Sequence, residues 1–125
     1  MTGAPRRDSL LAGIPRDLPA ELTTVLVDGT ASRIERIVSR GHATERGSWY
    51  EQDEDEWVLL VAGAARLELA DGAVVELAPG DWIDLPAGLR HRVAWTAPGT
   101  DTIWLAVFRR GPGGEAAGVR EAGTR

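Results

Sequence analysis

From Arg33 onward the sequence is a series of short apolar segments separated by turn residues, and this spacing constrains the fold more than any other feature. Segments of four to seven residues are too short for typical helices and are typical of strands joined by tight turns. The expected strands are 33–39, 56–61, 64–70, 74–77, 82–85, 90–96 and 102–108. The pattern therefore predicts an all-β domain, either a sandwich or a barrel.

Two of these segments carry more specific information. Asp71-Gly72 is the strongest signal for a two-residue hairpin turn in the sequence, and it lies between the alternating segment Ala64–Ala70 and the segment Val74–Leu77. Thr102–Phe108 is apolar on both faces. A strand of that kind is buried on both sides, so we expect it in the centre of a sheet.

The N-terminal part lacks the strand pattern that begins at Arg33. Residues 1–16 contain Pro, Arg and Gly without periodicity, and we expect a loose segment there. A short helix is expected from Pro19 to Leu26, with Asp17 near its start and Asp28-Gly29 at its end. The main domain then covers 17–110, and the Gly- and Ala-rich residues 111–125 are expected to form a flexible tail.

Composition excludes several classes of site and partner. The chain of 125 residues has no cysteine, which excludes disulfides and thiolate metal sites, and all 14 of its basic residues are arginine. A net charge of −5 without clustered basic residues argues against nucleic-acid binding. No segment is long and apolar enough to span a membrane, and none resembles a secretion signal. We expect no membrane partner and a cytoplasmic location.

Glu56 and His91 are the two polar residues that a purely structural role explains least well. In an extended chain Glu56 shares a face with Val58 and Leu60, so it begins a row that continues as core. By the same alternation, His91 shares a face with Val93 and Trp95. A buried carboxylate needs a cation, a metal or several hydrogen-bond donors. We therefore expect Glu56 and His91 to line one wall of an internal pocket.

The residues around His91 fit a known motif. Gly80, Pro86, Gly88 and His91 have the spacing of the second conserved motif of the cupin superfamily, and Trp95 stands where that motif has Asn. The chain thus resembles the cupins, in particular a group of small bacterial ones, over roughly residues 33–108. The resemblance implies a cupin-type jelly-roll β-barrel with a pocket between its sheets. Cupins of this kind are frequently dimeric, so we expect a homodimer.

The first cupin motif is matched only in part. It ends in His-x-His, a Glu and a Gly; Glu56 and Gly63 match, while Tyr50 and Gln52 occupy the two histidine positions. The usual cupin metal site of three His and one Glu is reduced to Glu56, His91 and the weaker amide ligand Gln52. The resemblance therefore implies either a weak, atypical site for a divalent metal ion of unknown identity, or a pocket without metal.

Three functions follow from this reading. The first is a protein that binds a small polar molecule, with Tyr50, Glu56, His91 and Trp95 as ligand-binding residues in an aromatic pocket. The alternative is a metal-dependent cupin enzyme, such as a dioxygenase, isomerase or lyase, acting on a small metabolite. A structural role for Glu56 and His91 is the third. His42, which precedes the first motif, lies either in an exposed loop or at the pocket mouth.

Overall fold

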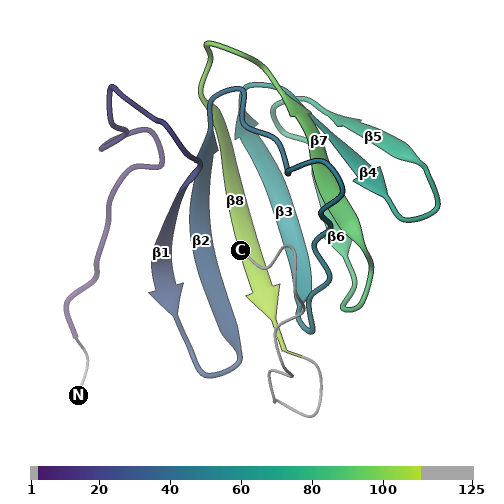
Figure 1. Cartoon of the computed structure of the whole chain (residues 1–125). Helices are drawn as coiled ribbons and strands as arrows, with labels where there is room; N and C mark the ends of the chain where they lie inside the picture. The colour runs from purple at the N-terminus through teal and green to yellow at the C-terminus, as the bar shows by residue number, and fades with distance from the viewer. Residues whose placement is uncertain (1–2, 111–125) are drawn as a thin grey trace.

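Eight strands and no helix make up residues 3–110, the part of the chain that this computed structural model describes (Figure 1). The strands are β1 (Leu22–Asp28), β2 (Ser32–Ser39), β3 (Asp55–Ala62), β4 (Ala65–Leu69), β5 (Val74–Leu77), β6 (Trp82–Leu85), β7 (His91–Thr96) and β8 (Thr102–Arg109). Within this range no helix could cross a membrane. The tail expected at 111–125 lies outside the described residues.

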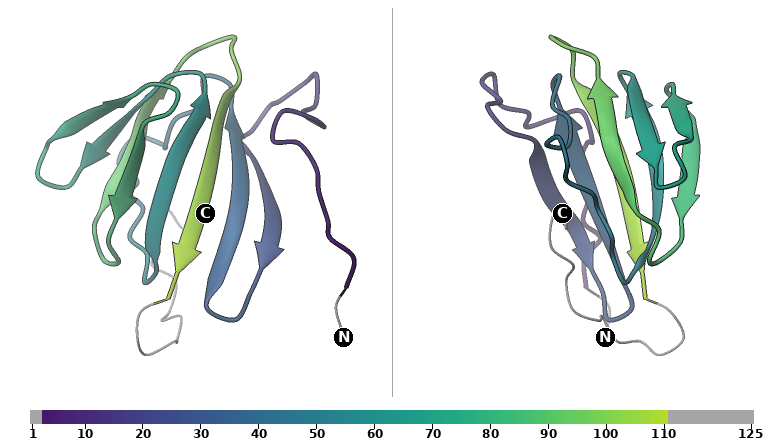
Figure 2. Two further views of the ribbon diagram at one scale, coloured as in Figure 1. Left: turned by 180° about the vertical axis from the view of Figure 1, so that it is seen from behind. Right: turned by 45° about the vertical axis from the view of Figure 1, so that its right-hand side comes forward.

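The strands form two antiparallel sheets that lie as two layers (Figure 2). The larger sheet has the order β1-β2-β8-β3-β6 and the smaller has the order β5-β4-β7. β8 pairs with β2 along its whole length and with β3 on its other side. The central position expected for 102–108 is therefore confirmed, because both edges of β8 are paired within the large sheet.

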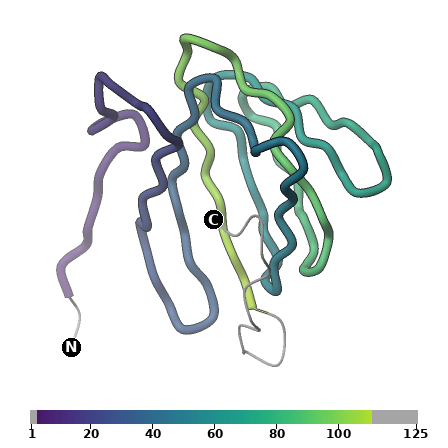
Figure 3. The backbone as a smooth tube through the Cα atoms, viewed as in Figure 1, coloured from purple at the N-terminus to yellow at the C-terminus, as the bar shows by residue number. Residues whose placement is uncertain are grey.

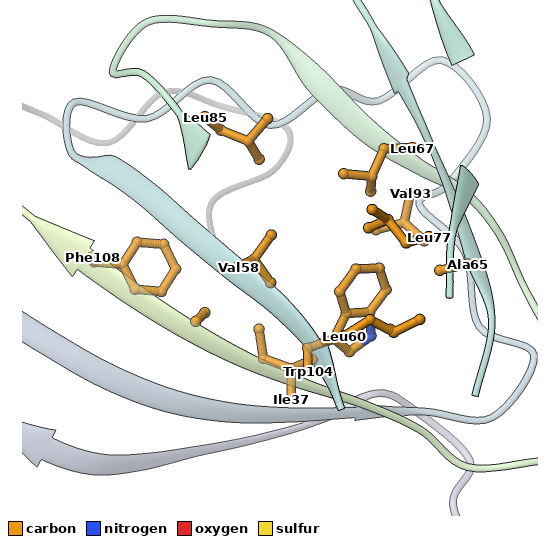
Figure 4. Close-up of a cluster of buried hydrophobic side chains, with 11 residues drawn as sticks. Ile37, Val58, Leu60, Ala65, Leu67, Leu77, Leu85, Val93, Trp104 and Phe108 are labelled. Carbon is orange, nitrogen blue, oxygen red and sulfur yellow. The ribbon is translucent and has the colours of Figure 1, made fainter. Parts of the chain in front are cut away.

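The core fills the space between the two layers (Figure 4). Val58 and Leu60 project from β3, and Trp104 and Phe108 project from β8, toward the side chains of the smaller sheet. Burying one side chain of this size contributes roughly 1.5–3 kcal/mol to stability. The buried apolar set is Ile37, Val58, Leu60, Ala65, Leu67, Leu77, Leu85, Val93, Trp104, Ala106 and Phe108.

Each expected strand is confirmed to within a residue or two, and a hairpin that contains Asp71-Gly72 joins β4 to β5. Its turn is longer than the two residues expected, because residues 70–73 separate the strands and the Gly72 N–H donates to the carbonyl of Leu69 at 2.9 Å. The helix expected from Pro19 to Leu26 is wrong, because residues 22–28 form β1. The reason is the run Thr23, Thr24 and Val25, whose β-branched side chains favour an extended backbone. Pairing with β2 then satisfies the backbone groups of this segment.

The N-terminal segment lies against the outer side of β2, where two arginines hold its backbone. Arg36 donates hydrogen bonds to the carbonyls of Leu10 and Ala12, at 3.3 and 2.6 Å. Arg40 donates to the carbonyl of Arg16 at 2.7 Å. These bonds attach a segment without regular secondary structure to the outer face of the large sheet.

The connection between β2 and β3 is the element that positions the site. It leaves the large sheet, runs beside β7 and then returns to β3 (Figure 3). The Thr44 N–H donates to the carbonyl of Val93 at 2.9 Å, and Val93 N–H donates to Thr44 Oγ1 at the same distance. Further along, Tyr50 and His91 exchange two backbone hydrogen bonds, at 2.7 and 3.0 Å. The connection thus acts as an irregular fourth strand of the smaller sheet.

Candidate functional site

Glu56 lies inside the protein, at the start of β3. Its side chain is on the core face with Val58 and Leu60, as the alternation predicts, and the residue is 0% exposed. Its neighbours across the sheet are Leu85 and Phe108, both buried. A carboxyl group is therefore held among apolar strands, where an ionised form needs compensation from nearby polar groups.

His91 begins β7 and faces the same interior, with 2% of its surface exposed. Its Nδ1 lies 3.1 Å from the carbonyl of Leu89. A carbonyl can only accept, so Nδ1 carries the proton and Nε2 of the neutral ring is an acceptor. Within the part of the chain that the structure describes, Nε2 has no hydrogen-bond partner, and it lies 3.6 Å from Glu56 Oε1.

This geometry limits what the pair can do. A separation of 3.6 Å is too long for a hydrogen bond. An acceptor nitrogen opposite a carboxylate oxygen is unfavourable unless one of the two groups is protonated or a cation lies between them. The pair can therefore hold a proton, a metal ion or a polar group of a ligand.

Tyr50 and Gln52 reach this region from the β2–β3 connection. The ring of Tyr50 lies 5.6 Å from the His91 ring, centre to centre, at an angle of 35°. Gln52 follows on the same segment, is 9% exposed, and accepts a backbone hydrogen bond from Gly88 at 2.7 Å. The structure thus brings Tyr50 against the His91–Glu56 pair and places Gln52 on the adjoining buried segment.

Trp95 does not join them. A β-bulge in β7 places Trp95 opposite Arg66 and Val93 opposite Leu67, so the alternation shifts by one residue after Val93. The Arg66 guanidinium lies 4.5 Å from the centre of the Trp95 ring, and the next residue, Thr96, is buried instead. The expectation that Trp95 shares a face with His91 is wrong, because alternation along a sequence cannot reveal a bulge.

A pocket of about 400 Å³ adjoins the site, and Tyr50 is among its lining residues. His42 lines it, but neither Glu56 nor His91 does, so this is not the internal pocket at whose mouth one interpretation placed His42. Glu21 also lines it, and sequence reasoning missed this residue because its segment was interpreted as a helix. The lining is Pro19, Ala20, Glu21, His42, Ala43, Thr44, Glu45, Ser48 and Tyr50. A larger cavity of about 760 Å³ beneath the N-terminal segment shares no lining residue with it.

The donor set fits a metal ion only weakly. Ligand bonds of about 2.0–2.2 Å place two ligands of one ion about 3.0–3.4 Å apart, close to the 3.6 Å between His91 Nε2 and Glu56 Oε1. However, residues 3–110 contain no cluster of three or more His, Cys, Asp or Glu that could hold a metal. Gln52 and Tyr50 would have to supply the remaining protein ligands, which makes a tight transition-metal site a poor fit.

Comparison with known proteins supports the family. A family model described as "Cupin domain" matches residues 37–108. A "putative mannose-6-phosphate isomerase" of Ralstonia eutropha is 42% identical with a TM-score of 0.82, covering 86% of this chain and 100% of its own. A cupin superfamily protein of Desulfitobacterium hafniense is 21% identical with a TM-score of 0.68, covering 84% of this chain and 92% of its own.

A polyketide cyclase of Streptomyces resistomycificus has the same fold, at 23% identity and a TM-score of 0.65, over 80% of this chain and 69% of its own. No curated protein matches the sequence. The matched family region covers more than half of the 125 residues. It includes Glu56, Gly63 and His91 at their motif positions, in two packed antiparallel sheets. The chain therefore belongs to the cupin superfamily.

Proposed function

We propose that this cupin binds a small polar molecule in the pocket that Tyr50 lines, beside the buried Glu56–His91 pair. One observation carries the proposal. Tyr50 lines the pocket, and its ring lies 5.6 Å from the His91 ring, centre to centre. A buried polar pair is therefore one side chain away from a cavity that opens to solvent.

Two physical arguments support a ligand here. A pocket of about 400 Å³ is within the range of about 300–1,000 Å³ that small-molecule sites occupy. Burying a carboxyl and an imidazole without an ideal hydrogen bond between them costs stability. A ligand group that donates to His91 Nε2 would remove part of this cost, because Nε2 is the acceptor of the neutral ring.

The test is a thermal-shift screen of hexoses, amino acids and short dicarboxylates. A ligand at about ten times its Kd stabilises the folded state by about 1.4 kcal/mol, which raises the Tm by several degrees. We expect at least one compound to do so, and expect Tyr50→Ala and His91→Gln to weaken its binding at least about tenfold. Glu76→Gln, at a carboxylate that is 81% exposed, is the matched control. Binding that survives both pocket substitutions would refute the proposal.

A metal-dependent cupin enzyme, such as a dioxygenase, isomerase or lyase, is the second candidate. The hydrogen bond from His91 Nδ1 to the Leu89 carbonyl favours it, because metal-binding histidines commonly donate their other N–H in this way. His91 Nε2 and Glu56 Oε1 would hold the ion, with the amide oxygen of Gln52 as a third ligand. A bound divalent ion would polarise a substrate oxygen.

Calorimetric titration with Mn²⁺, Zn²⁺, Ni²⁺ and Fe²⁺ separates the two candidates. We expect Kd values above about 10 µM, because only one imidazole and one carboxylate are available, and we expect His91→Gln to abolish the binding. Metal analysis of protein purified without an affinity tag provides the second measurement. About one equivalent of a transition metal in that protein would establish the metal site that the enzyme candidate requires. It would also contradict our expectation that the site binds metal only weakly.

A further inference from the structure

We propose that the pocket at Tyr50 selects a molecule that carries a positively charged amine beside a hydroxyl group, and that it excludes phosphorylated molecules. This inference rests on the proposed function and adds the chemical class of the ligand. Three observations support it: the charges of the lining residues, the buried hydrogen bonds that hold Glu21, and the position of the ring proton on His42.

The lining is acidic and contains no arginine. Glu21 and Glu45 line the pocket, and none of the arginines in residues 3–110, the part that the structure describes, does. Arg33, on the inner face of β2, is engaged by Glu35 at 2.7 Å and by Glu54 at 3.2 Å. Recognition of a phosphate normally uses arginine, lysine or clustered backbone N–H groups. An anionic ligand would instead meet two carboxylates.

Glu21 is held in place by a directed chain of hydrogen bonds. The indole N–H of Trp104 donates to Ser39 Oγ at 3.2 Å, and Ser39 donates to Glu21 Oε2 at 2.8 Å. An indole can only donate, so the hydroxyl proton of Ser39 is directed to Glu21. Ser39 and Trp104 are both buried, which fixes the position of the Glu21 carboxylate beside the pocket. One Glu21 oxygen is used by Ser39, and the carboxylate can accept further hydrogen bonds from an ammonium group.

His42 supplies the complementary donor. Its Nδ1 accepts the backbone N–H of Arg40 at 2.9 Å, so the proton of the neutral ring is on Nε2. Its own carbonyl accepts from Thr96 Oγ1 at 2.6 Å, which anchors the residue to β7. A ligand with an ammonium group for Glu21 and a hydroxyl oxygen for His42 would use both groups. The Tyr50 ring also favours a cation near its face.

The test uses three sugars that share one skeleton: mannosamine, mannose and mannose 6-phosphate. Each is titrated into the full chain while the indole N–H resonance of Trp104 is followed by NMR, because that group donates into the chain that supports Glu21. Trp104→Phe identifies the resonance. We expect mannosamine to bind at least about tenfold more tightly than mannose, and mannose 6-phosphate to show no saturable binding.

Two substitutions test separately which ligand charge the pocket prefers and whether the ligand binds in this pocket. We expect Glu21→Gln to remove the preference for mannosamine and Glu76→Gln, far more exposed, to retain it. The proposal is overturned if mannosamine does not bind, shows no preference over mannose, or keeps its preference in Glu21→Gln. If mannose 6-phosphate binds and Tyr50→Ala removes that binding, the charge class is wrong and the pocket stands. Sugar binding that is unchanged in Tyr50→Ala would overturn the proposed pocket as well.

Discussion

Replacing Gly63 with alanine should lower the free energy of unfolding by about 3–5 kcal/mol, the largest effect that we expect from any single methyl group in this protein. Gly63 has a φ of +89°, a backbone conformation that L side chains rarely adopt. An added Cβ would also lie 2.6 Å from Thr102 Cα and 2.8 Å from Thr102 Cβ. Thr102 is fully buried at the start of β8, so the backbone itself would have to move.

Gly72→Ala is the matched control, measured by urea denaturation alongside Gly63→Ala. Gly72 has nearly the same φ, +90°, but no atom lies within 4 Å of the position of its added Cβ. We expect that substitution to cost about 1–2 kcal/mol, from backbone strain alone. The difference between the two variants then measures the close approach of Gly63 to Thr102. Equal losses in both would show that the strand ends can separate without cost.

Replacing either Glu56 or His91 with leucine should destabilise the protein by about 3–5 kcal/mol, because each change leaves the other group buried with an altered partner. Replacing both should cost less than the sum of the two. We expect a coupling energy of at least about 1 kcal/mol, since an apolar pair of similar volume suits the surrounding core. Urea denaturation of the four proteins, the parent included, measures it.

The exposed pair Arg66–Glu76 provides the control cycle. Its closest atoms are 3.9 Å apart and its side chains are 46% and 81% exposed, so we expect a coupling below about 0.5 kcal/mol. Strictly additive effects of the Glu56 and His91 substitutions would show that the two groups do not interact in the folded protein. That outcome would remove the basis for treating them as one site.

The strands were predictable because their signals are local. In β4 and β5 the alternation of Leu67 and Leu69, together with the Asp71-Gly72 turn, is enough to specify a hairpin. The same holds for the inward positions of Glu56 and His91, because each lies within two residues of a buried Val that shares its face. Residues i and i+2 of a strand lie on the same face, and a bulge is rare within so few residues.

The remaining features depend on contacts between segments far apart in the chain. β1 was interpreted as a helix because its short sequence does not show that β2 pairs with it. The outward turn of Trp95 follows from a bulge against Arg66 and Leu67, which no local pattern reveals. Glu21 enters the site only through Ser39 and Trp104, which come from two other strands.

The position of β8 in the centre of the large sheet has a consequence for biosynthesis. β2 and β3 are adjacent in sequence, yet the sheet joins them only through Thr102–Arg109, near the end of the described chain. During translation β1 and β2 can form a hairpin, but β3 has no neighbour on that side until β8 has left the ribosome. The facing edges of β2 and β3 thus stay unpaired until Thr102–Arg109 is available, and the large sheet cannot close around its central strand before then.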